Sequence, residues 1–215
     1  MRLDHVSYVA SHDQISDVIN RIGSQIGTAF IDGGIHPKFG TRNFTAPLTN
    51  GQYIEVVCPL DHPATETSPF GRIVKRKAEE GGGWLAWVLS TNKIQEIEKR
   101  IGRESIVGTR RLPSGLEIEW KQLGVSVLLD NPGLPFFVEW LSKNHPSESG
   151  NPVSTIEKIM LFSNQDVVQD WIGVRFDLLT LKTVLEFHAN DEKNTYTGIS
   201  KVMFKNQDNE LVSIE

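Results

Sequence analysis

The sequence has little cysteine and no long apolar run. Its single cysteine, Cys58, cannot form a disulfide within the chain, so we expect a reducing compartment, the cytoplasm. The longest wholly apolar run, residues 84–89, is far below the roughly 18 residues that a membrane span requires. Residues 1–5 place an aspartate and a histidine where a secretory signal needs an apolar segment. We therefore expect no signal peptide and no membrane partner.

Positive charge is also scarce. The 215 residues include 22 Lys+Arg against 27 Asp+Glu, a formal net charge of −5, and the basic clusters are as short as residues 75–77. A general nucleic-acid binder needs a basic surface to neutralise phosphates, so we expect no nucleic-acid partner. With 39% hydrophobic residues, the chain is expected to fold as one large domain or as a few small related units.

An internal repeat organises most of the chain. Residues 5–23 align without a gap on residues 84–102, at a constant offset of 79. A weaker echo, which needs a gap, covers residues 156–173. The identical pairs of the first alignment are Val9/Val88, Ser11/Ser90, Ile15/Ile94, Arg21/Arg100, Ile22/Ile101 and Gly23/Gly102. A repeat of this length indicates one structural unit used more than once.

Each copy begins with an apolar run and continues with apolar residues at helical spacing. These residues predict a strand and then a helix, and we expect Gly23 to follow the end of the first helix. Strand-like segments come next, at residues 27–36, 43–48 and 52–58 in the first copy and at residues 105–111, 116–123, 125–129 and 134–141 in the second.

The predicted fold class is α+β. Residues 1–60 are expected to form a first βαβββ module and residues 83–142 a second, whose sheets curl toward each other into a curved, cup-like mixed sheet. Residues 155–215 are expected to add a shorter βαββ unit on the same domain. Residues 61–82 and 142–154 are rich in proline, serine, glycine and charge, and are predicted to be connectors rather than core.

Three polar residues stand on apolar strands, where a charge needs a partner or a metal. They are His5, Glu55 and Glu139. The repeat pairs Glu55 with Glu139 across the cup, and it pairs His5 with Trp84. A ring of four polar side chains would therefore lack one member at Trp84. The alternative is that His5 is hydrogen-bonded within its strand and that both glutamates point outward or pair with cations.

These segments resemble the vicinal oxygen chelate superfamily and, within it, the glyoxalase-like group. The resemblance rests on residues 3–6, 33–43, 53–56 and 135–140, and it covers most of residues 1–142. It implies paired βαβββ modules that form a cup, with a divalent metal held by the first and last strands of each module. His5, Glu55 and Glu139 match three of the four metal positions, and Trp84 departs from the fourth. Members of the superfamily include lyases, dioxygenases, isomerases, epimerases and metal-free proteins that sequester small molecules.

The first hypothesis is a glyoxalase-like enzyme that acts on a small oxygenated molecule. Mn²⁺, Fe²⁺, Ni²⁺ or Zn²⁺, held by one imidazole and two carboxylates, would keep open positions for substrate oxygens. The glycine-rich segment 33–40 presents His36, which is expected to act as a general acid or base or to replace the missing ligand. Glu139 is the second expected catalytic residue. An equally strong alternative for His36 is a turn that satisfies its own backbone.

The second hypothesis is a metal-free protein that binds or sequesters a small molecule in the same cup, which Trp84 in place of a ligand favours. The residues expected to line the pocket are Thr41, Asn43, Tyr53, Trp84 and Phe137. The substrate, the reaction and the identity of the metal stay open, and so does a homodimer formed through exposed sheet edges.

Overall fold

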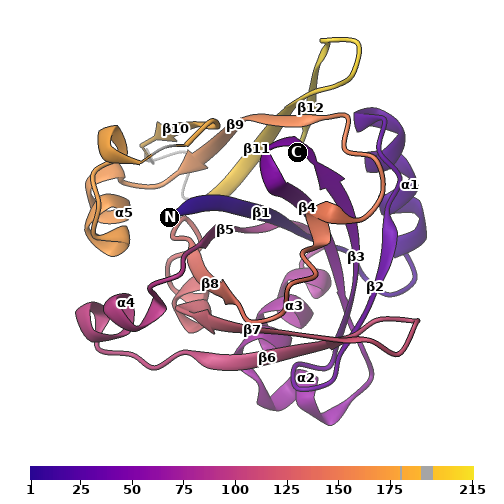
Figure 1. Ribbon diagram of the computed structural model, residues 1–215, viewed down its shortest axis with the longest axis horizontal. Coiled ribbons are helices and arrows are strands. Elements are labelled where there is room, and N and C mark those ends of the chain that lie inside the picture. The colour runs from indigo at the N-terminus through magenta and orange to yellow at the C-terminus, as the bar shows by residue number, and fades with distance from the viewer. Residues whose placement is uncertain (180, 190–195) are drawn as a thin grey trace.

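The computed structural model describes residues 1–179, 181–189 and 196–215. A closed barrel of eight strands carries a separate four-strand sheet on its outer side (Figure 1). The predicted third unit includes residues 180 and 190–195, which lie outside the described residues. Within the described ranges, no helix is long and apolar enough to cross a membrane.

The barrel consists of two βαβββ modules, as the repeat predicted. The first contains β1 (Arg2–Val9), α1 (Ile15–Ile26), β2 (Ile31–His36), β3 (Thr41–Leu48), the 3-10 turn η1 (Thr49–Gly51) and β4 (Gln52–Pro59). The second contains β5 (Gly83–Ser90), α4 (Ile94–Ile101), β6 (Ile106–Arg111), β7 (Glu117–Leu123), η2 (Val125–Leu129) and β8 (Phe136–Trp140). The strand predicted at 125–129 is wrong, because Gly124 with a φ of 92° turns the chain into a 3-10 helix.

The two modules meet at two unequal joints. The strands follow one another around the barrel in the order β1-β4-β3-β2-β6-β7-β8-β5. β1 pairs along its length with β5 in antiparallel orientation, and it is parallel to β4 on its other side. At the opposite joint, β2 and β6 share a single registered pair, Ile35 with Arg111. This closed mixed sheet confirms the predicted cup.

The barrel wall separates two apolar cores. Val9, Val57 and Val88 belong to the inner core. Val6 and Ile54 belong to the outer core, which packs against α1, α4 and the second sheet. Because neighbouring residues of a strand point to opposite faces, the inner core marks the side of the strands on which a ligand site can lie.

Residues 61–82 contribute to the inner core, so their prediction as a connector was wrong. They form two helices, whose first turns hold Pro63 and Pro69 and are capped by the side chains of the preceding residues. α3 buries Phe70, Ile73 and Val74, which follow helical spacing. The proline-rich helix starts resembled a loop in the sequence. The bounds are Pro63–Thr67 for α2 and Pro69–Glu79 for α3.

The first helix does not end where the repeat predicted. α1 continues beyond Gly23 to Ile26, and Gly27 with a φ of 68° ends it. Gly23 lies inside the helix, where a Cβ atom would approach the carbonyl oxygen of Thr28 to 2.9 Å. The repeated glycine therefore serves a close backbone approach in the first module, whereas Gly102 ends α4.

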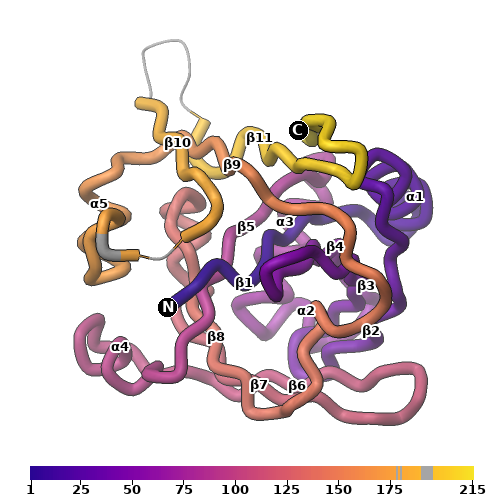
Figure 2. The backbone as a smooth tube through the Cα atoms, turned by 45° about the horizontal axis from the view of Figure 1, so that its top comes forward, coloured from indigo at the N-terminus to yellow at the C-terminus, as the bar shows by residue number. Residues whose placement is uncertain are grey.

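The second sheet covers the outer face of the barrel beside β5 (Figure 2). Its helix α5 leads to β10, which pairs directly with β9 in parallel orientation, and the strands follow the order β10-β9-β11-β12. The indole of Trp84 stacks on Phe204 of this sheet, with ring centroids 6.4 Å apart. The elements are β9 (Thr155–Phe162), α5 (Gln165–Ile172), η4 (Phe176–Leu178), β10 (Val184–His188), β11 (Gly198–Lys205) and β12 (Leu211–Ile214).

Candidate functional site

A small cavity of about 30 Å³ lies inside the barrel. Its wall combines aromatic rings with six polar side chains, each from a different strand and each at most 5% exposed. The polar residues are His5, His36, Asn43, Glu55, Arg110 and Gln122, and the aromatic residues are Tyr53, Phe70, Trp120, Phe136 and Trp140. Buried polar groups at this density need hydrogen-bond partners from the protein or from a ligand.

Glu55 is held by hydrogen bonds at both carboxylate oxygens. Ser7 Oγ donates to Oε2 and Asn43 Nδ2 donates to Oε1, each at 2.7 Å. Burial raises the pKa of Glu55, but the charges of His5 and His36 and these two hydrogen bonds outweigh burial, so the pKa lies below its ordinary value. Glu55 is therefore a fixed carboxylate anion at neutral pH.

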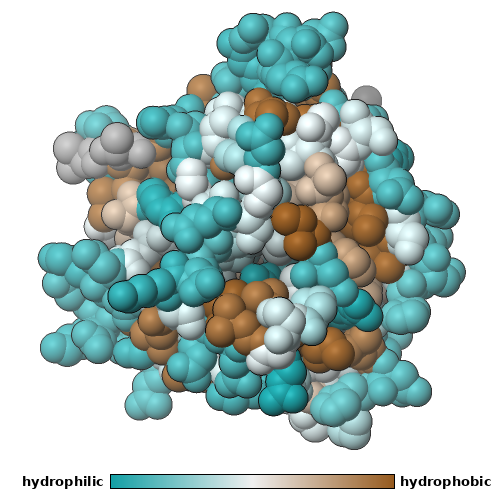
Figure 3. All heavy atoms as spheres, turned by 45° about the vertical axis from the view of Figure 1, so that its right-hand side comes forward, coloured by the Kyte–Doolittle hydropathy of each residue, from teal (hydrophilic) through white to brown (hydrophobic). Residues whose placement is uncertain are grey.

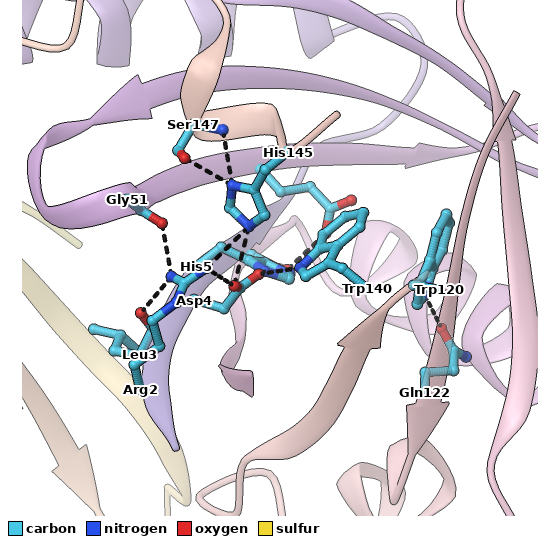
Figure 4. A network of polar contacts seen from close by, with 12 residues as sticks. Arg2, Leu3, Asp4, His5, Gly51, Trp120, Gln122, Trp140, His145 and Ser147 are labelled. Carbon is cyan, nitrogen blue, oxygen red and sulfur yellow. Dashed lines mark hydrogen bonds and ion pairs between the residues drawn. The ribbon is translucent and has the colours of Figure 1, made fainter. Parts of the chain in front are cut away.

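His5 is oriented by the residue before it. Its Nδ1 lies 3.0 Å from Asp4 Oδ2 (Figure 4). Strict strand alternation would turn these two side chains apart, but the register between β1 and β5 shifts from Leu3 to His5, and both residues are buried. Because a carboxylate only accepts, Nδ1 carries the proton and Nε2 of a neutral ring keeps its lone pair. That Nε2 lies 3.9 Å from Glu55 Oε2.

Asp4 accepts from several further donors. Trp140 Nε1 and His145 Nε2 lie 3.2 Å and 3.1 Å from its carboxylate oxygens, and Arg2 Nη2 lies 3.0 Å away (Figure 4). Burial raises the pKa of Asp4, but the hydrogen bonds and charges of His145 and His5 lower it far more, to well below the ordinary range. Asp4 is therefore a permanent anion behind the His5 ring. The sequence did not reveal this role, because neighbouring residues of a regular strand would point to opposite faces.

Residues 141–154 form a strap that packs against β3 and β4 of the barrel. The strap contains the 3-10 turn η3 (Pro146–Glu148), and His145 Nδ1 accepts from the backbone N–H of Ser147 at 3.2 Å. Since Nδ1 accepts, Nε2 carries the proton that is donated to Asp4. The ring also lies edge-on to Tyr53 and Trp140, at centroid distances of 5.5 Å and 5.0 Å. The strap thus contributes to the site, beyond its predicted role as a connector.

Two buried donors in the cavity wall have no acceptor among the described residues. They are Arg110 Nε and Gln122 Nε2. Trp120 Nε1 donates to Gln122 Oε1 at 3.1 Å, which turns the amide nitrogen away from the indole. Burial lowers the pKa of Arg110, yet a guanidinium stays protonated in proteins. A ligand oxygen, above all that of an anion, would satisfy both donors.

His36, at the end of β2, also lines the cavity. Its Nδ1 lies 2.9 Å from Thr41 Oγ1, and its ring is edge-on to Trp120 at 5.5 Å. Burial lowers the pKa of His36 to about 4, so the ring is neutral at pH 7. The glycine-rich segment before it has a steric reason, because a Cβ atom at Gly33 would lie 2.2 Å from Asn43 Oδ1.

The structure places five of the expected site residues in the cavity wall and a sixth behind it. His5, His36, Asn43, Tyr53 and Glu55 line the cavity, and the buried Thr41 bonds to the His36 ring.

Trp84, Phe137 and Glu139 lie elsewhere. His5 is in register with Val88, and a further register shift between Ser7 and Tyr8 turns Trp84 outward, where Nε1 donates to the Ile214 carbonyl at 2.9 Å. Phe136, Val138 and Trp140 line the cavity, so Phe137 and Glu139 point to the other face of β8. Phe137 packs on Trp171 in the outer core, and Glu139 is partly exposed. The repeat alignment contains no gap, so it could not reveal the shift in β1–β5 pairing.

The donor set does not fit the divalent metal that the resemblance implies. His5 and Glu55 share the cavity without Glu139, and both oxygens of Glu55 already accept hydrogen bonds. The buried cation Arg110 interacts with Glu55 and would repel a second cation. Within the described part of the chain, no group of three or more His, Cys, Asp and Glu side chains is arranged to hold an ion.

Comparisons with known proteins agree with this architecture. The glyoxalase-like domain family matches residues 3–172, and no curated protein matches the sequence. The crystal structure of a hypothetical protein from Staphylococcus aureus superposes with a TM-score of 0.68 at 15% identity, covering 100% of this chain and 98% of that chain. The methylmalonyl-CoA epimerase from Mycobacterium tuberculosis gives a TM-score of 0.43 at 17% identity, covering 66% of this chain and 89% of that chain. The family match spans most of the sequence, and the chain belongs to the glyoxalase-like domain family, as the resemblance to the vicinal oxygen chelate superfamily predicted.

Proposed function

We propose that the chain is an enzyme of the vicinal oxygen chelate type that moves a proton at a carbon next to a carbonyl group, in a small molecule that carries a carboxylate. One observation carries the proposal. The Asp4-oriented His5 lines the same cavity as the two unpartnered donors, Arg110 Nε and Gln122 Nε2. A base and an oxyanion site side by side are the two requirements of this chemistry.

The proton transfer uses groups that are already in position. His5 Nε2 takes the proton from carbon, so that a C–H bond breaks, an N–H bond forms and the electron pair moves to the carbonyl oxygen. Gln122 Nε2 donates to the enolate oxygen, and Arg110 binds the carboxylate. Asp4 and the nearby Glu55 anion stabilise the imidazolium, which then returns the proton to carbon.

The metal-dependent form of the hypothesis stays a prediction. The resemblance implies Mn²⁺, Fe²⁺, Ni²⁺ or Zn²⁺ bound by His5, Glu55 and Glu139, whereas the donors in the cavity are arranged for hydrogen bonding. No step above depends on a metal. The cytoplasmic setting and the homodimer also stay predictions from the sequence.

A metal-free binding protein is the second candidate. The aromatic rings in the cavity wall favour it, because they contribute to binding whether or not a reaction follows. Such a protein would hold the same anion at Arg110 and would not exchange its protons.

Isotope exchange separates the two candidates. The protein is incubated with 2-oxobutanoate in D₂O, and the C3 proton signal is followed by NMR against a protein-free control. We expect protein-dependent loss of the signal, which His5→Asn lowers by about 100-fold or more and which His12→Asn, at an exposed histidine, leaves unchanged. Binding without exchange would support the binding protein, and exchange that survives in His5→Asn would overturn the assignment of the base.

A further inference from the structure

A second hollow adjoins the cavity at Arg110. Its volume is about 350 Å³, and Arg110 is the residue that lines both spaces. We call it the outer groove. It runs between the strap, the turn that joins β6 to β7, and strand β2. Its lining residues are Ile31, Asp32, Gly33, Thr45, Arg110, Leu112, Pro113, Ser114, Ile118, Asn144, His145, Pro146 and Ser149.

The sizes of the two spaces limit how a ligand can bind. The inner cavity of about 30 Å³ has room for little more than one water-sized group. Small-molecule sites usually measure about 300–1,000 Å³, and the outer groove lies within that range. Of the two spaces that Arg110 lines, only the outer groove has room for the remainder of a small molecule.

The groove wall is mainly apolar and offers no second cation. Leu112, Pro113 and Ile118 supply apolar surface. Asp32 is already ion-paired with Arg42 and accepts from the backbone N–H of Gly34. Among the described residues that line the groove, Arg110 is the only lysine or arginine.

The strap side of the groove is neutral as well. His145 accepts at Nδ1 from a backbone N–H and donates at Nε2 to Asp4, so both ring nitrogens are engaged. The groove therefore lacks the cations that a phosphate-bearing tail would need. On the face seen in Figure 3, hydrophobic residues form separate patches among hydrophilic ones.

From these observations we propose that the ligand is a carboxylate with an uncharged aliphatic chain. The carboxylate binds at Arg110, and the chain lies in the outer groove. The inference rests on the proposed function only for the anionic head, and it holds whether the protein turns the ligand over or binds it.

Chain length is the first test. The affinities of octanoate, butanoate, octylamine and malonyl-CoA are measured by calorimetry on the full chain. Each buried methylene contributes about fourfold in affinity, so we expect octanoate to bind about tenfold or more tighter than butanoate. We expect octylamine, which lacks the anionic head, not to bind. Equal affinities for the two acids, or tighter binding of malonyl-CoA with its phosphate-bearing tail, would overturn the proposal.

A matched pair of variants locates the chain. Leu112 and Leu116 belong to one hairpin turn, where the N–H of Leu112 donates to the carbonyl of Leu116 at 2.9 Å, but only Leu112 lines the groove. We expect Leu112→Asp to weaken octanoate binding by about tenfold and to leave butanoate binding unchanged. Leu116→Asp should leave both unchanged. Equal effects of the two variants would place the chain elsewhere, whereas absence of isotope exchange with intact chain-length dependence would overturn only the proposed reaction.

Discussion

Asp4 and His5 are neighbours in the chain, and their side chains are hydrogen-bonded to each other at 3.0 Å inside the barrel. Adjacent residues of a regular strand point to opposite faces, so this contact requires the irregular pairing found between β1 and β5. The irregularity places a permanent anion behind an imidazole whose other nitrogen faces Glu55.

Asp4→Asn should reduce stability strongly. The amide keeps one acceptor oxygen but removes the charge that His5, Trp140 and His145 share. We expect the free energy of unfolding in urea to fall by about 2–4 kcal/mol. Asp13→Asn, at an exposed residue, is the control, and an equal loss in both variants would contradict the structural role of Asp4.

His36 should make stability depend on pH in a defined window. Burial lowers the pKa of His36 from 6.5 to about 4, so between these values the unfolded chain binds a proton that the folded chain does not. Its contribution to the unfolding free energy is complete above pH 6.5 and decreases by about 3 kcal/mol as the pH falls to about 4.

The difference between His36→Gln and the parent protein isolates this effect. Urea unfolding is measured at several pH values, with the exposed His12→Gln as the control. We expect the parent and His12→Gln to lose stability in parallel and His36→Gln to have a flatter profile. Parallel profiles for all three proteins would contradict a buried neutral His36.

Ligand-induced changes in tryptophan fluorescence should come from the cavity wall. Trp120 and Trp140 line the cavity, whereas Trp84 bonds to Ile214 on the outer side of the barrel. We expect Trp120→Phe to remove most of the change produced by octanoate and Trp84→Phe to preserve it. The opposite result would indicate that Trp84 lines the pocket, as expected from the sequence.

Arg100 should stabilise the docking of the second sheet. Its guanidinium donates to the carbonyls of Asp170, Trp171 and Ile172 at the end of α5. We expect Arg100→Ala to lower the free energy of unfolding by about 1–2 kcal/mol. Lys99→Ala removes the same charge from an exposed neighbour on α4 and should have little effect.

Metal content tests the remaining prediction from the resemblance. The protein is purified without tag or chelator, incubated with Mn²⁺, Fe²⁺, Ni²⁺ or Zn²⁺, dialysed and examined by elemental analysis. Because Glu55 is engaged by Ser7 and Asn43, we expect no stoichiometric metal. A stoichiometric ion that is lost in His5→Ala would contradict this expectation and support the metal-dependent hypothesis.

The sequence predicted the module order well because strand and helix periodicities are local properties. It predicted the cavity less completely, since Gln122 reaches the site through strand pairing between distant segments. His5 and Glu55 stood out as polar residues on apolar strands. Trp84 did not lie where the repeat placed it, because a register shift in β1–β5 changes which face a residue occupies and leaves no mark in composition.

The two modules of the barrel are joined by one long strand pairing and by one weak joint. β1 and β5 pair along their length, but β2 and β6 are bridged by the single pair of Ile35 and Arg111, directly beside Arg110. Parting the two modules at this weak joint would break one registered strand pair, the hydrogen bond from Lys38 Nζ to the Val107 carbonyl and the contact of Arg110 with Asn43, and it would leave every other strand pairing intact. The least costly way into the barrel therefore leads from the outer groove to the guanidinium that we assign to the ligand.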